Sequence, residues 1–328
     1  MGPAELRSLH FSFINLFIPR RPVRRGIFLG TFMTSAPAAG TAALALLVSM
    51  ILWSSSFIAL KFSFQYFDPM VVIFGRMAIA SCCFALLYVG RRDFFQLKFF
   101  RREDLKLLII MVIAEPCLYF LCEAHAINLT TASQAGVITA ILPVLVMIAA
   151  SRLLGERMPR IVWAGALLAL AGVIALTLAG SASESAPHPI LGNFLEFVAM
   201  LCATVYTIAM KKLASRYSPL FLTAIQAITG CIFFFPLLFF PGTELPHEFN
   251  TAGTLAVIYL GAVITIGAYG LYNFSLKYVT ASRAAACVNL IPVFSVLLGW
   301  LLLGERLNGT QIIAGGMILL GVFFTQKR

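Results

Sequence analysis

Long apolar segments recur along the whole chain and constrain its fold more than any other feature. They are rich in Leu, Ala and Ile, they run without polar alternation, and short polar linkers separate them. A helix needs about 20 apolar residues to cross a bilayer, whereas barrel strands would alternate apolar with polar residues. We therefore predict an all-α integral membrane protein with ten transmembrane helices. The predicted spans are residues 41–64, 69–90, 105–126, 131–153, 160–179, 190–210, 219–240, 253–275, 281–303 and 309–325.

The composition excludes several other classes of protein. Apolar residues make up 60% of the 328 residues and charged residues only 11%, with a mean hydropathy of +0.94. A soluble domain of this size has too little interior for so much apolar surface, which instead must face lipid. All seven cysteines lie in apolar runs without zinc-type spacing, and no catalytic or phosphate-binding motif is present. We expect no metal, no cofactor and no catalytic residue.

The basic residues predict how the chain is oriented. If residues 1–39 form a basic cytoplasmic tail and the spans alternate, 21 of the 24 Lys and Arg residues fall in inner segments. Such a bias marks the cytoplasmic side, and it explains the net charge of +11 without nucleic acid. We predict a multi-pass protein of the cell (inner) membrane with both termini in the cytoplasm. Translation can start at Met1 or at Met33, which would leave a shorter tail.

An internal repeat divides the chain into two halves. Thr131-Ala132-Ser133 returns as Thr280-Ala281-Ser282, and Leu-Leu-Gly-Glu-Arg at 153–157 returns at 302–306, both at an offset of 149. A weaker match at an offset of 150 relates Lys61 to Lys211. Each half holds five spans, and because five is odd, the second half must enter the membrane upside down. Inverted repeats of this kind let one central site open to either side.

These repeated motifs resemble those of the EamA family of the drug/metabolite transporter superfamily. In each half, an early helix ends in Lys, a turn contains Pro, and a later Thr-Ala-Ser and Pro helix closes with Leu-Gly-Glu-Arg. The pattern Trp53-Ser-Ser-Ser-Phe57 with Lys61 and Arg76 also fits. The resemblance implies two inverted five-helix EamA repeats, at residues 41–179 and 190–326, around a central cavity that carries small metabolites. The sequence departs from the family pattern at Gln226, where the second repeat would be expected to carry Arg opposite Arg76.

Charged residues inside the spans are costly and mark a cavity or a partner helix by default. We interpret Lys61, Arg76, Glu123 and Glu196 as structural or gating charges, with Arg76 paired to Glu123 or Glu196. Glu115 has no evident basic neighbour at its depth and precedes a proline. It is therefore either a site for a proton or a substrate ammonium, or a protonated packing residue.

Polar and aromatic residues deep in the spans are candidates for substrate binding. A small amphipathic solute needs aromatic walls with a few hydrogen-bonding groups, although such residues also join neighbouring helices. With Glu115, the candidates are Trp53, Ser55, Tyr119, Tyr206, Tyr269, Tyr272 and Asn289.

The repeat motifs themselves predict structural roles. Pro143 and Pro292 occupy equivalent places and are expected to kink their helices. Gly155 and Glu156, with Gly304 and Glu305, are expected to form short turns in which the Glu caps the adjacent helix or pairs with the local Arg.

The leading hypothesis is a secondary transporter of a small metabolite that works by alternating access. We predict an exporter, for example of amino acids or related solutes, with the lipid bilayer and the solute as its partners. Proton coupling and a homodimer stay open. One alternative is an intramembrane enzyme or a lipid-handling protein, which would need a nucleophile–base pair or a metal cluster. Another is a sensory or scaffold protein, which would bring a soluble domain.

Overall fold

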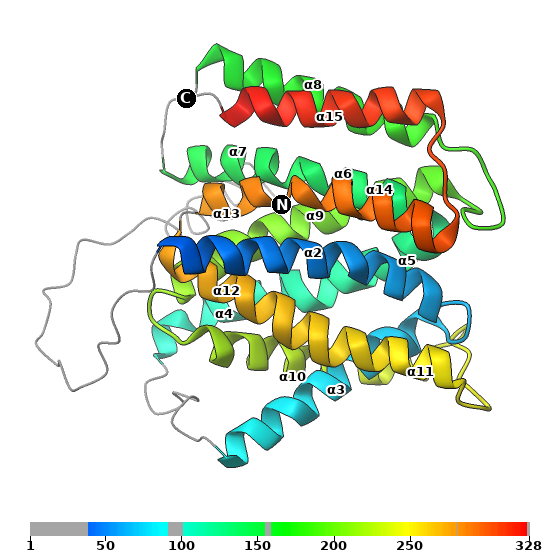
Figure 1. Cartoon of the computed structure of the whole chain (residues 1–328). Coiled ribbons are helices and arrows are strands. Elements are labelled where there is room, and N and C mark those ends of the chain that lie inside the picture. The colour runs from blue at the N-terminus through cyan, green and yellow to red at the C-terminus, as the bar shows by residue number, and fades with distance from the viewer. Residues whose placement is uncertain (1–38, 91–100, 155–158, 280, 327–328) are drawn as a thin grey trace, which may run out of the picture.

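The computed structural model describes residues 39–90, 101–154, 159–279 and 281–326. They form a helical bundle in which most helix axes run along one direction (Figure 1). The elements of the first half are α2 (Ala39–Ser63), α3 (Pro69–Gly90), a short 3₁₀ turn (Arg102–Asp104), α4 (Leu105–Val112), a π-helical segment (Ile113–Leu118), α5 (Tyr119–Leu129), α6 (Ala132–Ile138), a 3₁₀ turn (Thr139–Ile141), α7 (Leu142–Leu154) and α8 (Arg160–Leu178). Those of the second half are α9 (Pro189–Leu213), α10 (Pro219–Leu237), α11 (Thr251–Ile258), a π-helical segment (Tyr259–Ala268), α12 (Tyr269–Tyr278), α13 (Ala281–Cys287), α14 (Leu290–Leu303) and α15 (Gly309–Gln326).

The length and apolar character of these helices agree with a membrane bundle. Within the described ranges, eight helices are long and apolar enough to cross a bilayer, and Leu290–Leu303 and Gly309–Phe324 are two shorter apolar helices. Many large apolar side chains point out of the bundle, among them Leu167, Leu178 and Ile232. An exposed apolar surface of this kind is stable in contact with lipid and costly in contact with water.

Local signals in the sequence set where helices begin. Prolines occupy the first turn of α9 and α10, where a missing N–H costs no hydrogen bond. Before α15, the Asn308 side chain accepts from the Gln311 N–H at 2.9 Å, and the Gln311 side chain accepts from the Asn308 N–H at 2.9 Å. This reciprocal capping satisfies two N–H groups that an uncapped helix would leave unpaired.

Four of the predicted spans are interrupted, and the interruptions fall at equivalent places in the two halves. The π-helical segments Ile113–Leu118 and Tyr259–Ala268 are related by the repeat offset. The 3₁₀ turn before Pro143 corresponds to the break between α13 and α14 before Pro292. A proline cannot donate to the carbonyl four residues earlier, so Pro116, Pro143 and Pro292 weaken three of these helices, whereas the segment Tyr259–Ala268 contains no proline.

Equivalent helices of the two halves cross in opposite directions. In α8 and α15, which lie side by side in Figure 1, a Cβ on Gly172 would meet Ile318 and Ala314, while one on Gly321 would meet Ala169 and Gly165. As the position rises along α8, the contact position falls along α15. The two helices therefore run antiparallel, and their glycines let the backbones approach closely.

A second equivalent pair shows the same arrangement. A Cβ on Gly136 of α6 would meet Ser295 of α14, and one on Gly299 of α14 would meet Ser133 of α6. As the position rises along α6 from 133 to 136, the contact position falls along α14 from 299 to 295. The helices α6 and α14 therefore also cross antiparallel.

Candidate functional site

The two ends of the bundle are held by equivalent lysines. The half-buried Lys61 donates through Nζ to the carbonyls of Ile127 and Thr130, at 2.7 and 2.8 Å. Lys211 donates through Nζ to the carbonyls of Leu276 and Val279, which are the same positions displaced by the repeat offset. Each lysine thus binds the unpaired carbonyls where a helix ends, at the negative end of the helix dipole.

The residues near each lysine show which connections share an end of the bundle. A surface pocket lined by Lys61, Gln65, Asn128, Glu184 and Glu305 joins four connections at one end. At the other end, Asp104 binds Arg216 and Tyr217, so the start of the third span contacts the turn between α9 and α10. Burial of the Tyr217 hydroxyl raises its pKa, so it stays a hydrogen-bond donor to Asp104 at neutral pH.

Glu305 caps a helix of the opposite half, which corrects the expectation that it would serve its neighbour. Its carboxylate accepts from the Ala132 N–H at 2.9 Å, the Ser133 N–H at 2.8 Å and the Ser133 hydroxyl at 2.6 Å. Gly304 takes a left-handed conformation with φ of 68° at the end of α14, a conformation that glycine adopts without strain. Residues 155 and 156, the matching positions of the first half, lie outside the described residues.

A broken helix brings the third span to the centre of the bundle. Glu115 has φ of −150° and ψ of 118°, an extended conformation inside the π-helical segment, because a residue before proline is driven out of the helical region. Its carbonyl accepts from Gln226 Nε2 at 3.4 Å. Conversely, Arg76 of the first half donates through Nε to Thr265 Oγ1 in the broken span of the second half, at 2.8 Å. Residues 76 and 226 therefore make equivalent contacts with different chemistry.

A central cavity lies beside these broken helices and is lined from both halves of the chain. Its volume is about 40 Å³, which holds about three water molecules. A metabolite therefore needs the surrounding helices to separate. The wall contains Trp53, Ser56, Phe57, Arg76, Glu115, Tyr119, Glu123, Thr139, Leu142, Met200, Ala203, Tyr206, Thr207, Tyr269, Tyr272, Val288 and Ile291.

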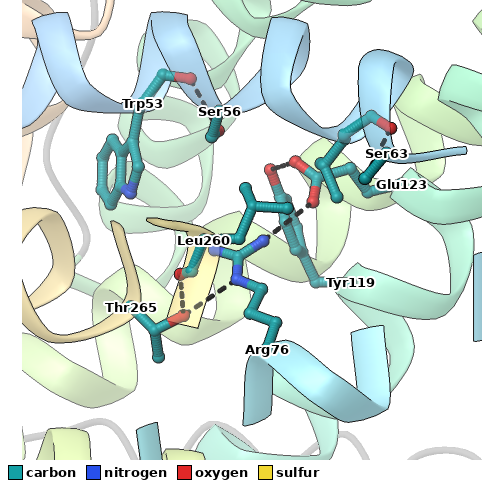
Figure 2. A network of polar contacts seen from close by, with 9 residues as sticks. Trp53, Ser56, Ser63, Arg76, Tyr119, Glu123, Leu260 and Thr265 are labelled. Carbon is teal, nitrogen blue, oxygen red and sulfur yellow. Dashed lines mark hydrogen bonds and ion pairs between the residues drawn. The ribbon is translucent and has the colours of Figure 1, made fainter. Parts of the chain in front are cut away.

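Arg76 is held at this wall by partners on three sides. Its Nη1 lies 3.8 Å from Glu123 Oε2, and Figure 2 shows the guanidinium between Thr265 and Glu123. Its central carbon lies 4.2 Å from the centre of the Phe120 ring, a distance at which a cation and an aromatic face attract. Tyr119 donates to the other oxygen of Glu123 at 2.7 Å. Of the two partners considered for Arg76, Glu123 is the one that the structure pairs with it.

The remaining two acidic side chains have different surroundings. Glu115 is 3% exposed and contacts the Tyr269 hydroxyl, with Arg76 and Glu123 within electrostatic reach. The expectation that no basic group lies near Glu115 is therefore wrong, because Glu115 and Arg76 line the same cavity. Glu196 of α9 is fully buried, and neither of its carboxyl oxygens has a hydrogen-bond partner among the described residues.

Aromatic side chains form one wall of the cavity. The ring of Trp53 lies 5.0 Å from that of Tyr269 and 4.8 Å from that of Tyr272. The Tyr206 hydroxyl donates to Asn273 Oδ1 at 2.5 Å, and Asn273 Nδ2 donates to Thr223 at 2.8 Å. This buried polar network fixes Tyr206 in position, whereas Trp53 Nε1 and the Tyr272 hydroxyl have no hydrogen-bond partner among the described residues.

Most, but not all, of the predicted substrate-binding residues reach the cavity wall. Ser55 and Asn289 do not line it: Ser55 is bonded to the Tyr259 hydroxyl at 2.7 Å, and Asn289 lies at the break between α13 and α14. Conversely, Thr139 and Thr207 line the wall although they were not predicted. Thr207 lies one turn beyond Ala203 on the same face of α9. Its position directly after Tyr206 in the sequence did not indicate that it lines the cavity. Within the described ranges, no group of three or more metal-binding side chains gathers.

The model of the EamA-like transporter family matches residues 40–178 and again residues 190–326. The chain belongs to this family. EamA-like chains are named as transporters, so this protein is a multi-pass membrane transporter with a two-repeat architecture.

Individual relatives extend over nearly the whole chain. An uncharacterized transporter of Archaeoglobus fulgidus is 27% identical and covers 86% of this chain and 98% of its own. A probable terminal-alkyne amino-acid exporter of Streptantibioticus cattleyicolor is 23% identical, covering 87% and 93%. The riboflavin transporter ImpX of Fusobacterium nucleatum is 26% identical, covering 87% and 97%. One solved crystal structure superposes with a TM-score of 0.64 at 19% identity, covering 87% of this chain and 97% of that chain, which shows the fold alone.

Proposed function

We propose that this EamA-like chain is a secondary transporter that moves small metabolites by alternating access around the central cavity. The proposed direction is export, with amino acids or related solutes as the cargo and with both termini on the cytoplasmic side of the inner membrane. Ten spans, five in each half, cross the membrane in this arrangement. The lining residues come from both halves, which is the single observation that carries the proposal.

The paired helix breaks support a mechanism in which the two halves exchange conformations. Broken helices at corresponding places in the two halves surround the substrate site in inverted-repeat transporters. Here the π-helical segments Ile113–Leu118 and Tyr259–Ala268 are such a pair. The antiparallel crossing of α8 and α15 supports an inverted second half. With the cavity closed around about 40 Å³, a metabolite is admitted only when one end of the bundle opens.

The relatives support the choice of solute class without fixing it. One of them is named as a probable terminal-alkyne amino-acid exporter and another as a riboflavin transporter. Both solutes combine apolar surface with hydrogen-bonding groups. The aromatic wall with polar edges in this chain offers the same combination.

Blocking the cavity tests the proposal. Purified protein in liposomes is loaded with unlabelled amino acids and assayed for counterflow of the labelled mixture. Ala203→Trp places an indole on the wall, whereas Leu201→Trp places one on a 42% exposed position of the same helix. We expect Ala203→Trp to abolish counterflow and Leu201→Trp to keep it, with both variants monodisperse. Equal counterflow in the two variants contradicts a pathway through this cavity.

A further inference from the structure

The central cavity carries more acidic than basic groups. On its wall, as far as the described residues go, Arg76 is the single basic side chain, whereas Glu115 and Glu123 are acidic. Glu196, which does not line the wall itself, is a third carboxyl group beside the cavity. It lies on the same face of α9 as the wall residues Met200, Ala203 and Thr207, because these positions are four, seven and eleven residues further on. One guanidinium can balance only one of the three carboxylates.

Arg76 is already committed to its own partners. Figure 2 shows it between Thr265, which accepts from its Nε, and Glu123, which lies 3.8 Å from its Nη1 without a hydrogen bond. The Phe120 ring covers the guanidinium. A solute that carries only negative charge would find this arginine opposed by Glu123 and would face Glu115 on the wall, with Glu196 one turn before Met200 on α9. Electrostatics therefore disfavours an anionic solute.

Glu196 is a fully buried carboxyl group whose two oxygens both lack a hydrogen-bond partner among the described residues. The titratable groups facing it are Glu123, Tyr119 and Cys122, all on α5, and none of them supplies positive charge. A buried carboxylate without a partner costs several kcal/mol by general estimates, so Glu196 requires either a proton or a cationic ligand.

Besides the carboxyl groups, the aromatic wall is a second feature that favours a bound cation. The ring centre of Trp53 lies 5.0 Å from that of Tyr269 and 4.8 Å from that of Tyr272. The faces of Trp and Tyr rings attract ammonium groups, more strongly where water is excluded. Carboxyl groups and aromatic faces on the same small cavity together match a protonated amine.

We propose that the solute carried by this transporter bears a protonated amine, and that this amine and protons exchange at Glu196 and Glu115. The inference rests on the proposed transport function and names its substrate class. When the amine enters, each carboxylic acid that it contacts releases one proton and becomes a carboxylate paired with the ammonium. When the amine leaves, the carboxylates take up protons again, so one conformational cycle exchanges amine for protons.

Binding to the purified full chain tests this inference with three solutes of the same length. The probes are 1,4-diaminobutane, 1,4-butanediol and succinate, and the measurement is isothermal calorimetry between about pH 6 and pH 8. We expect only the diamine to bind, with an affinity that weakens up to tenfold per pH unit on acidification for each proton displaced. Glu196→Gln removes one exchangeable proton and lowers this slope. Glu115→Gln does the same for its own proton, and Glu248→Gln on an exposed loop is the matched control that changes nothing.

The outcomes separate this inference from the transport function. Binding of succinate or the diol as tight as that of the diamine overturns the inference, as does an unchanged pH slope in both folded cavity variants. If liposomes carry amino acids by counterflow while the diamine neither binds nor competes, the transport function stands and the amine assignment falls. If no solute passes in counterflow but the diamine binds with the expected slope, the transport function fails and the cation site remains.

Discussion

The cap that Glu305 places on α6 provides the sharpest test of how the two halves are joined. The first three N–H groups of α6 are all satisfied from outside the helix. Those of Ala132 and Ser133 donate to Glu305, and that of Gln134 donates to the Thr131 hydroxyl at 3.1 Å. A helix start left without these acceptors has unpaired N–H groups, which is costly where water is scarce.

The cost of losing Glu305 follows from its three hydrogen bonds. A bond to an ionised group contributes about 1.5–3 kcal/mol when buried. Because Glu305 is partly exposed, water replaces part of each bond, and about 1 kcal/mol for each is a reasonable value. Glu305→Ala is therefore expected to lower the free energy of unfolding by about 3 kcal/mol. Glu305→Gln keeps one acceptor oxygen, so we expect about half of that loss.

Unfolding in mixed micelles measures this free energy. Purified protein is titrated with sodium dodecyl sulfate and followed by tryptophan fluorescence, alongside Glu248→Ala as a control on an exposed loop. The order expected is Glu305→Ala least stable, then Glu305→Gln, with Glu248→Ala equal to the unmodified chain. If Glu305→Ala unfolds together with Glu248→Ala, the cap does not join the two halves and the reasoning is wrong.

Three further predictions concern other contacts between the helices. Gly321→Ala should lower the free energy of unfolding by about 1–3 kcal/mol, because the new Cβ would lie 2.4 Å from the Ala169 nitrogen. Gly316→Ala on the same helix is the control, since its Cβ meets nothing within 4 Å. Equal unfolding of the two variants would contradict the close crossing of α8 and α15. Cysteines introduced at Ser215 and Glu184, which are exposed at opposite ends of the bundle, should react with an impermeant maleimide from opposite sides of the membrane, and labelling from one side contradicts the topology. Lys211→Met should destabilise the chain by about 1–2 kcal/mol, since two helix-end carbonyls lose their donor, and a thermal melt equal to that of the unmodified protein would contradict this role.

Much of the architecture could be predicted from the sequence because the bilayer imposes simple rules. Backbone groups in hydrocarbon must be paired within a helix, so continuous apolar segments and short linkers determine which residues form spans. The internal repeat placed equivalent residues correctly: Lys61 and Lys211, matched at an offset of 150, bind carbonyls that are related by the offset of 149. These predictions depend only on local composition and spacing.

The partners of individual side chains depended on contacts between distant segments. Glu305 lies next to α15 in the sequence but caps α6, and Ser55 faces Tyr259 rather than the cavity. Glu115, in a span that is broken before Pro116, lines the same cavity as Arg76 of α3. Helical periodicity gives the face on which a side chain lies, but it does not give the helix that this face meets.

The sequence by itself determined that this chain forms membrane helices in two related halves, because apolar length and internal repetition are properties of the chain alone. Only the tertiary structure decided which charges share the central cavity. One guanidinium and two carboxyl groups on its wall, with Glu196 beside it, come from α3, α9 and the broken third span, which are up to 120 residues apart in the sequence. Their imbalance arises from packing, because the electrostatic energy of a buried group depends on which charges lie within a few ångströms of it.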